Sequence, residues 1–540
     1  MISSWVRAAA ALAAITLVTA GCAGPVAAPA GSPAASAAAS ATPKKGGTLV
    51  AVIGRDPATG NMDITSDTNG FFAFTPVYSS LVEIGPNGQV TPDLAKSWTV
   101  SADGKRYEFK LNAAKFHDGR PVTSADVKYT AEEVAGKYAP KFTPSYKLVD
   151  RVEAPDASTV VFTLKQPSAT FLQSLAHHSI VILPQHIYAG SDPRQNPQNS
   201  KPIGSGPFKF KEWVKGDHIT LERNADYFKP DVPYFDQVIF RILPDAGSRA
   251  IAFQKGDIDT LTGQLVAREQ VADLKKIAGV QVNDQDDPPG EELLQFNTTR
   301  KPFNDLKVRT AFVSAIDRAA VVERAFFGQG AELPTTHIPK QLKLFHDTTV
   351  KLPTRDVAKA GSLLDEAGYP KGANGIRLTV KLAYDQTNDA DKRSAEVVRD
   401  NLKDAAVQVE LQPLDSAVVA KEVYTDANFD MWTVSVTSNG DPELGIARFY
   451  TTQSIKVSFG NASRYSNPEI DQAFAQGAST TDLKERQAAY KKVQEILARD
   501  LPTLPLADYE NIDFARPDIG GVTQSPIGYP YFYIQRLWRK

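Results

Sequence analysis

Cysteine and histidine, which often act as nucleophiles and metal ligands, are scarce in this chain of 540 residues. Cys22 is the only cysteine, so it has no partner for an internal disulfide and cannot build a multi-thiolate zinc or iron–sulfur site. His177 and His178 are adjacent, so on a strand or a helix their side chains point in different directions and shared metal ligation is not expected. Cys22 is then either a catalytic thiol or a processing signal.

Sequence motifs for catalysis are also absent. The chain has no G-x-S-x-G elbow, no P-loop, no H-E-x-x-H helix and no complete G-x-G-x-x-G fingerprint. The acidic run "NDQDDPPGEE" at 283–292 does not match a calcium-binding loop, and we interpret it as a solvated turn. We therefore expect no catalytic residues, no metal site and no cofactor. A secreted hydrolase stays an alternative, which a nucleophile, a base and an orienting residue would identify.

The residues around Cys22 favour a processing signal. Arg7 makes the N-terminus positive, and the stretch Ala8–Ala20 that follows is apolar or small and too short to span a membrane. Thr19-Ala20-Gly21-Cys22 resembles the bacterial lipobox, in which the peptidase cuts before a cysteine that carries a diacylglycerol. We interpret 1–21 as a signal peptide and Cys22 as a lipidation site; an ordinary cleaved signal is the alternative.

Composition sets the remaining limits. After Cys22, residues 23–45 are almost wholly Ala, Pro, Ser and Gly, so we expect 22–45 to be a lipidated, flexible tether. The 60 Lys and Arg residues nearly balance the 62 Asp and Glu residues without a basic cluster, so nucleic acid is not an expected partner. These features predict a protein held by a lipid at the extracytoplasmic face of a bacterial membrane.

The rest of the chain mixes strand and helix patterns, which is typical of an α/β protein. "RYEFKL" and "TVVFTLK" alternate as half-buried strands do, and Thr123 and Asp126 have the spacing of a capping box at the start of a helix between them. One helix is predicted over 306–328, ending at Gly328. "IRLTVKLAY", "KRSAEVVRDNLKDA" and "VQVELQPL" predict a βαβ unit with parallel strands.

Five stretches of residues 46–540 carry a dense, shared set of motifs. They are "VYSSLVEIGPNGQVTPDLAKSWTVSADGKRYEFKLNAAKFHDGRPVTSADVKYT", "IGSGPFKFKEWVKGDHITLERNADYF", "AFQKGDID", "FNTTRKPFNDLKVRTAFVSAID" and "DVAKAGSLLDEAGYP". Together they resemble the extracellular solute-binding proteins of family 5, which serve bacterial ABC importers for peptides and nickel. Most of these motifs are turns and helix caps, so they identify a fold and do not name a solute.

The resemblance implies an α/β fold of two lobes: a clamshell of the type II periplasmic-binding class, with an extra subdomain in lobe I. Lobe I would comprise 46–290, with the subdomain at about 80–200, and 508–540; lobe II would be 291–507. The implied function is capture of a solute between the lobes for ABC permease subunits, by a monomer without enzymatic activity. An oligopeptide or dipeptide is the expected solute; a metal chelate, a glycoside or another small organic molecule is the alternative.

The resemblance also points to a strand that lacks an expected acid. In peptide-binding members, the strand corresponding to "FDMWTVSVTSNGDPE" carries a tryptophan and then an aspartate that binds the α-ammonium of the ligand. These positions are Val436 and either Ser438 or Asn439 here, unless Asp441 replaces the aspartate. Asp441 also fits a helix N-cap before Pro442. We predict that a bound α-amine meets another acid or backbone carbonyls, because a buried ammonium needs a counter-charge.

Four aromatic or histidine side chains match positions that reach the cleft in relatives. Phe71 and Phe72 would contact apolar parts of a ligand, with packing in the lobe I core as the alternative for either ring. His178 would offer a polar contact, with an exposed loop position as its alternative. Tyr529 would donate a hydrogen bond from its hydroxyl, with core packing as its alternative.

Overall fold

The computed structural model describes residues 43–85, 89–283, 289–438, 440–522 and 530–540. The predicted signal peptide, Cys22 and most of the tether lie outside these residues, as do Asn439 and Tyr529. Among the described residues, no helix has both the length and the apolar character needed to cross a membrane.

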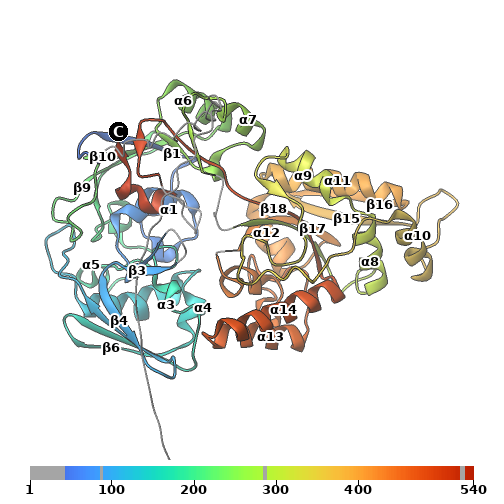
Figure 1. The fold of residues 1–540 in the computed structure, drawn as a ribbon, viewed down its shortest axis with the longest axis horizontal. Coiled ribbons are helices and arrows are strands. Elements are labelled where there is room, and N and C mark those ends of the chain that lie inside the picture. The colour runs from blue at the N-terminus through green and yellow to red at the C-terminus, as the bar shows by residue number, and fades with distance from the viewer. Residues whose placement is uncertain (1–42, 86–88, 284–288, 439, 523–529) are drawn as a thin grey trace, which may run out of the picture. The chain divides into compact units, whose positions relative to one another are not determined.

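The first half of the chain is built on two four-stranded sheets (Figure 1). One has the order β1-β10-β9-β8, with β1 and β10 parallel, and the other is the antiparallel sheet β4-β5-β7-β6. Their strands are β1 (Thr48–Ile53), β4 (Ala95–Val100), β5 (Arg106–Leu111), β6 (Val149–Asp156), β7 (Thr159–Leu164), β8 (Phe208–Val214), β9 (His218–Arg223) and β10 (Gln237–Ile242). Strands β5 and β7 confirm the two predicted from alternation.

Smaller elements complete this half. The helices are α1 (Thr68–Phe74), α2 (Ser124–Tyr129), α3 (Gly136–Tyr138), α4 (Thr143–Tyr146), α5 (Gln185–Tyr188), α6 (Ala246–Lys255) and α7 (Val271–Leu274). The short strands are β2 (Val82–Ile84), β3 (Val90–Pro92), β11 (Thr260–Leu261), β12 (Gln281–Asn283), β19 (Asp513–Ala515), β20 (Ile519–Gly520) and β21 (Trp538–Arg539). Helix α2 begins with the predicted capping box of Thr123 and Asp126. Since β19 pairs with β11 and β12, the C-terminal segment packs with the first half.

The second half is built on one mixed sheet of six strands, in the order β14-β18-β13-β17-β15-β16. Its strands are β13 (Gly290–Phe296), β14 (Ala331–Glu332), β15 (Leu378–Asp385), β16 (Val407–Leu414), β17 (Met431–Thr437) and β18 (Thr503–Tyr509). The predicted βαβ unit is confirmed as β15, α11 (Asp389–Asp404) and β16, because the two strands pair in parallel. The chain enters this sheet through β13 and leaves it through β18, and these two strands are antiparallel neighbours.

Helices cover both faces of this sheet (Figure 1). They are α8 (Leu306–Ala315), α9 (Arg318–Phe326), α10 (Val357–Glu366), α11 (Asp389–Asp404), α12 (Ser416–Val419), α13 (Pro468–Ser479) and α14 (Leu483–Asp500). Leu294 of β13 packs in the core shared with α8 to α11, whereas its neighbour Leu293 packs in the core shared with α13 and α14. The alternation of side chains along a strand explains this division.

The single helix predicted over 306–328 is wrong, because the chain forms two helices there. Ile316 has an extended backbone after α8, and the Asp317 side chain accepts a hydrogen bond from Ala320 N as the N-cap of α9. The apolar spacing continues through the break, so the periodicity did not reveal it. Gly328 follows the left-handed residue Phe327 at the end of α9, where a helix stop was expected.

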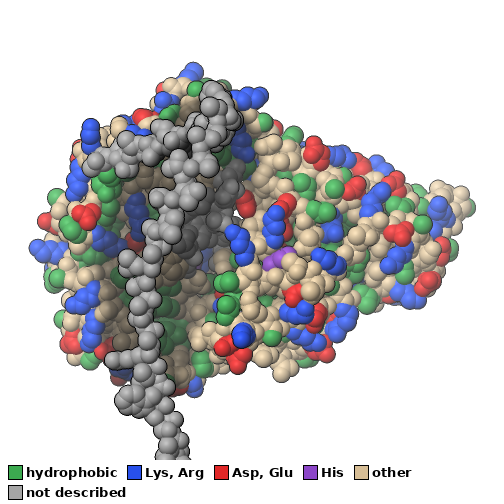
Figure 2. Space-filling view, viewed as in Figure 1, with side chains coloured by type: hydrophobic (Ala, Val, Ile, Leu, Met, Phe, Trp, Pro, Cys, Tyr) green, Lys and Arg blue, Asp and Glu red, His purple; other side chains and the backbone are tan. Residues whose placement is uncertain are grey.

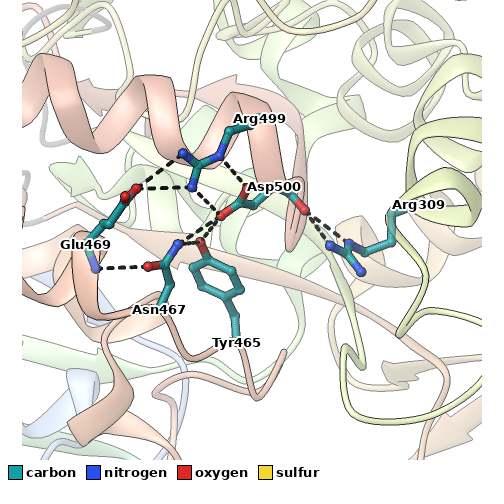
Figure 3. A network of polar contacts seen from close by, with 6 residues as sticks. All are labelled: Arg309, Tyr465, Asn467, Glu469, Arg499 and Asp500. Atoms are coloured by element: carbon teal, nitrogen blue, oxygen red, sulfur yellow. Dashed lines mark hydrogen bonds and ion pairs between the residues drawn. The ribbon is translucent and has the colours of Figure 1, made fainter.

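A polar network at the end of α14 holds the helices of the second half together (Figure 3). Arg309 of α8 donates from Nε and Nη2 to the carbonyl oxygen of Asp500, at 3.1 and 2.8 Å. The carboxylate of Asp500 accepts from Asn467 Nδ2 at 3.0 Å and from the Tyr465 hydroxyl. Arg499 Nε donates to the same carboxylate at 2.7 Å. These bonds join α8, the start of α13 and the end of α14.

Candidate ligand-binding site

Asp441 serves as a helix cap in the structure. Its carboxylate accepts a hydrogen bond from Glu443 N at 2.9 Å, at the start of the short helical segment Pro442–Ile446. It also forms an ion pair with Arg486, with Nη2 at 2.8 Å from Oδ2, and both side chains are largely buried. A ligand ammonium at Asp441 would therefore compete with an arginine that is already in place.

Val436 and Ser438, the predicted positions before Asp441, carry no charged side chain that could bind an ammonium group. Val436 lies on β17, and its side chain packs in the core shared with α13 and α14. Ser438 is buried, donates its backbone N–H to Pro289 O at 3.0 Å, and keeps a buried hydroxyl without a hydrogen-bond partner among the described residues. Asn439 lies outside those residues. The end of β17 thus offers a hydroxyl in place of the expected carboxylate.

Three of the predicted site residues, Phe71, Phe72 and His178, lie in the first half of the chain. Lys141 interacts with two of them, Phe71 and His178. The Lys141 ammonium lies 4.3 Å from the centre of the Phe71 ring. Phe72 has no exposed surface and lies in the core. His178 is 8% exposed, so the exposed-loop alternative is wrong. Burial, and then the positive charge of Lys141, lower the pKa of His178 to about 3, so the imidazole is neutral at pH 7.

Lys141 also interacts with a cation of the second half. Burial, and then the charge of Arg448, lower the pKa of the Lys141 ammonium to about 8. Arg448 lies in the turn Ala447–Phe449 and donates from Nη2 to Thr437 O, at the end of β17, at 3.5 Å. Two cationic groups from opposite halves of the chain are therefore close enough to repel one another, and one of them, Arg448, hydrogen-bonds to the end of this strand. A carboxylate that reached both side chains would accept charge-assisted hydrogen bonds from them.

Two buried acids occupy the neighbouring strand β13. The interpretation of 283–292 as a solvated turn is wrong for Glu291 and Glu292, which are both buried within the sheet. Burial raises the pKa of both carboxyls above the usual range. Glu292 accepts a hydrogen bond from Ser435 Oγ at 2.6 Å, while Glu291 pairs in register with Asp508 of β18. A signal was present in the sequence, since both acids directly precede the apolar run "LLQF".

One cluster of possible metal ligands lies in the first half. Within the described parts of the chain, Glu83, Asp93 and His177 bring one ligand atom each within 4.8 Å of one another. Lys229 Nζ lies 3.0 Å from Glu83 Oε1 and 2.8 Å from Asp93 Oδ1, and Arg536 Nη2 lies 3.0 Å from Glu83 Oε2. These two side-chain cations balance the two carboxylates, so we assign the cluster to a network of ion pairs and not to a metal site.

Comparison with known proteins identifies the family. A family model described as bacterial extracellular solute-binding proteins, family 5 Middle, matches residues 89–456. The chain belongs to this family. Di/tripeptide-binding protein 1 of Pseudomonas aeruginosa is 30% identical over 509 residues, which cover 89% of this chain and 91% of the relative.

Two solved structures are similar over nearly the whole chain. The PBP AgaA from A. tumefaciens R10, in complex with agropinic acid, has a TM-score of 0.78 and 28% identity, with 92% of this chain and 99% of that chain covered. The oligopeptide-binding protein AppA from Bacillus subtilis, in complex with a nonapeptide, has a TM-score of 0.78 and 26% identity, with 92% and 100% covered.

The family membership has direct consequences. It confirms the two-lobed α/β fold and the prediction of a solute-binding protein that works with ABC permease components outside the cytoplasm. Proteins of this family bind solutes for transport and are not enzymes. Figure 2 shows Lys, Arg, Asp and Glu side chains interspersed over the described part of the visible face.

Proposed function

We propose that this protein captures short peptides outside the membrane and delivers them to an ABC permease. In this proposal, residues 46–290 and 508–540 form one lobe, residues 291–507 form the other, and the peptide binds between them. The protein acts as a monomer, and a lipid on Cys22 holds it at the membrane. Relatives that bind di- and tripeptides and a nonapeptide support the peptide assignment.

The observation that carries this proposal is the approach of Lys141 to Arg448. Each cation comes from a different lobe, and the Lys141 pKa of about 8 reflects burial together with the nearby guanidinium. A peptide carries a carboxylate at its C-terminus, which would accept hydrogen bonds from both side chains. Because such a ligand contacts both lobes, it would stabilise the arrangement in which they lie close together.

A small organic acid is the second candidate ligand. The similar structure of AgaA was solved with agropinic acid, and its identity to this chain, at 28%, is close to that of the peptide-binding relative. The same two cations would bind the carboxylate of such an acid. Short peptides and small organic acids share a carboxylate but differ in the rest of the ligand, so a ligand screen distinguishes the two candidates.

The proposal is tested by calorimetric titration with tripeptides that carry either a free or an amidated C-terminus. We expect the free acid to bind at least tenfold more tightly, because the amide lacks the charge that Lys141 and Arg448 receive. Lys141→Met should remove most of this difference. Lys137→Met is the matched control, since Lys137 is exposed and pairs with Glu133.

A thermal-shift screen of peptides and organic acids completes the test. Stabilisation by peptides of two to five residues supports the proposal. Stabilisation by organic acids without any by peptides would overturn it in favour of the second candidate.

A further inference from the structure

Glu291 of β13 and Asp508 of β18 are directly opposite one another in the sheet register, and we name them the acid pair. Their side chains belong to residues that are only 1% and 3% exposed. Glu291 Oε1 and Asp508 Oδ1 are buried without a hydrogen-bond partner among the described residues. By contrast, the buried carboxylate of Asp391 accepts a hydrogen bond from Ser435 N at 2.9 Å, and Ser435 Oγ lies 2.7 Å from the same oxygen.

The charged side chains near the acid pair form hydrogen bonds or ion pairs with other groups. Arg448 faces Glu291 and donates to a backbone carbonyl, and Tyr450 lies on the same side. Lys340, Glu332 and Arg318 face Asp508. Lys340 pairs with Glu332, and Arg318 donates from Nη1 to a backbone carbonyl at 2.8 Å. Among the described residues, neither Glu291 Oε1 nor Asp508 Oδ1 accepts a hydrogen bond from these side chains.

The acid pair lies beside the position where the expected acid is missing. Glu291 pairs in register with Val436 of β17, two residues before Ser438. The resemblance to peptide-binding members assigns an ammonium-binding aspartate to Ser438 or Asn439 in this strand. A carboxylate from the adjacent strand therefore stands close to the end of β17 where this chain has none. Arg448 connects the acid pair with Lys141, because it interacts electrostatically with Lys141 and with Glu291.

We propose that the acid pair binds a primary ammonium group of the ligand, either the α-amine of a peptide or the side chain of a lysine. An ammonium has three donors and one positive charge, so it would satisfy both buried carboxylates and offset their repulsion. Together with Lys141 and Arg448, the acid pair would make the site selective for ligands with both charges. This inference rests on the proposed peptide-binding function.

The inference predicts opposite effects of one substitution on stability and on binding. Glu291→Gln keeps the shape of the side chain and removes one of two neighbouring buried charges. The ligand-free variant should therefore melt at a higher temperature than the wild type at pH 8, and it should bind a free-amine peptide more weakly. If Glu291 served only the packing of the sheet, Glu291→Gln would lower the melting temperature and not raise it.

The experiment is a calorimetric titration with Ala-Phe-Ala, N-acetyl-Ala-Phe-Ala and N-acetyl-Ala-Lys-Ala. We expect acetylation of Ala-Phe-Ala, or Glu291→Gln, to weaken binding at least tenfold, and both together to weaken it little further. Recovery of affinity with N-acetyl-Ala-Lys-Ala shows that a lysine side chain can replace the α-amine; no recovery restricts the acid pair to the α-amine. Glu292→Gln, an equally buried acid on the other face of β13, should bind Ala-Phe-Ala as the wild type does.

Two results would overturn the inference while leaving the proposed function intact. One is equal wild-type affinity for the free and acetylated forms of Ala-Phe-Ala. The other is wild-type affinity in both Glu291→Gln and Asp508→Asn, the second variant that guards against a folding defect in the first. If the wild type binds none of the three peptides, the proposed function fails and the inference fails with it.

Discussion

Asp441 and Glu291 are both buried acids near the end of β17, and they differ in the groups that face them. Asp441 has a hydrogen bond from a helix terminus and an ion pair with Arg486. Glu291 faces a second acid, Asp508, and has an unpartnered oxygen. A carboxylate that is fully paired within the chain stabilises the fold, whereas one that is buried and lacks a partner is available to a ligand.

Removing Arg486 should destabilise the fold strongly. Arg486→Ala leaves the Asp441 carboxylate buried without its cation, and breaking a buried ion pair costs about 3–5 kcal/mol. Urea denaturation measures this loss in the free energy of unfolding. Lys276→Ala is the control, because Lys276 and Asp273 are both exposed and such pairs contribute less than about 1 kcal/mol. Similar losses in the two variants would contradict the structural role of the Asp441 pair.

At the scale of elements, strand β13 carries acids on both of its faces. Glu292 hydrogen-bonds to Ser435 on the face covered by α11, and Glu291 belongs to the opposite face with Asp508. Both acids belong to an acidic sequence run that resembles a turn, and only the pairing of β13 with β17 and β18 buries them. The apolar run "LLQF" after them indicates a strand, but it does not indicate that this strand lies between two others in the sheet.

The buried acids, Glu292 and Asp391 among them, should lower the free energy of unfolding as the pH rises from 7 to 8. Burial raises the pKa of Glu292 to about 7, so near pH 7 the folded state holds a proton that the unfolded state has lost, and burial followed by the charge of Glu292 shifts the pKa of Asp391 in the same direction. Raising the pH removes these protons and lowers the free energy of unfolding. Buried histidines such as His178 act in the opposite direction only below about pH 6.5, where the unfolded imidazole is protonated. Lys141, with a pKa of about 8, also acts in the opposite direction, but it is one group against several buried acids.

Urea denaturation at pH 7 and at pH 8 measures this dependence. Asp391→Asn keeps an acceptor for Ser435 N and removes one titrating group, so this variant should show a smaller decrease than the wild type. Asp273→Asn is the control, since Asp273 is exposed and the decrease should be unchanged. A wild-type protein that becomes more stable between the two pH values would contradict the assignment of the buried acids.

At the scale of the whole molecule, the sequence predicted the family and the fold better than the site. Capping boxes, turns and the βαβ pattern depend on residues that are close in sequence, so their motifs identified the fold. The break between α8 and α9 was missed because the apolar spacing continues through Asp317. Lys141 and Arg448 were missed because they are far apart in sequence and influence one another only in the folded chain.

Attachment to the membrane is a prediction for the intact protein in its host. Cys22→Ser removes the only thiol that can carry a diacylglycerol, so the variant should leave the membrane fraction and lose incorporation of a labelled fatty acid. Its affinity for peptides should equal that of the wild type. A variant that stays in the membrane fraction would contradict the lipid anchor and favour another means of attachment.

Native mass spectrometry of the protein purified from its own host tests the peptide assignment most directly. The account predicts bound species of a few hundred daltons that are released on unfolding and whose fragments are those of peptides with free termini. Release of a sugar, a metal chelate or a small organic acid as the sole bound species would contradict the account.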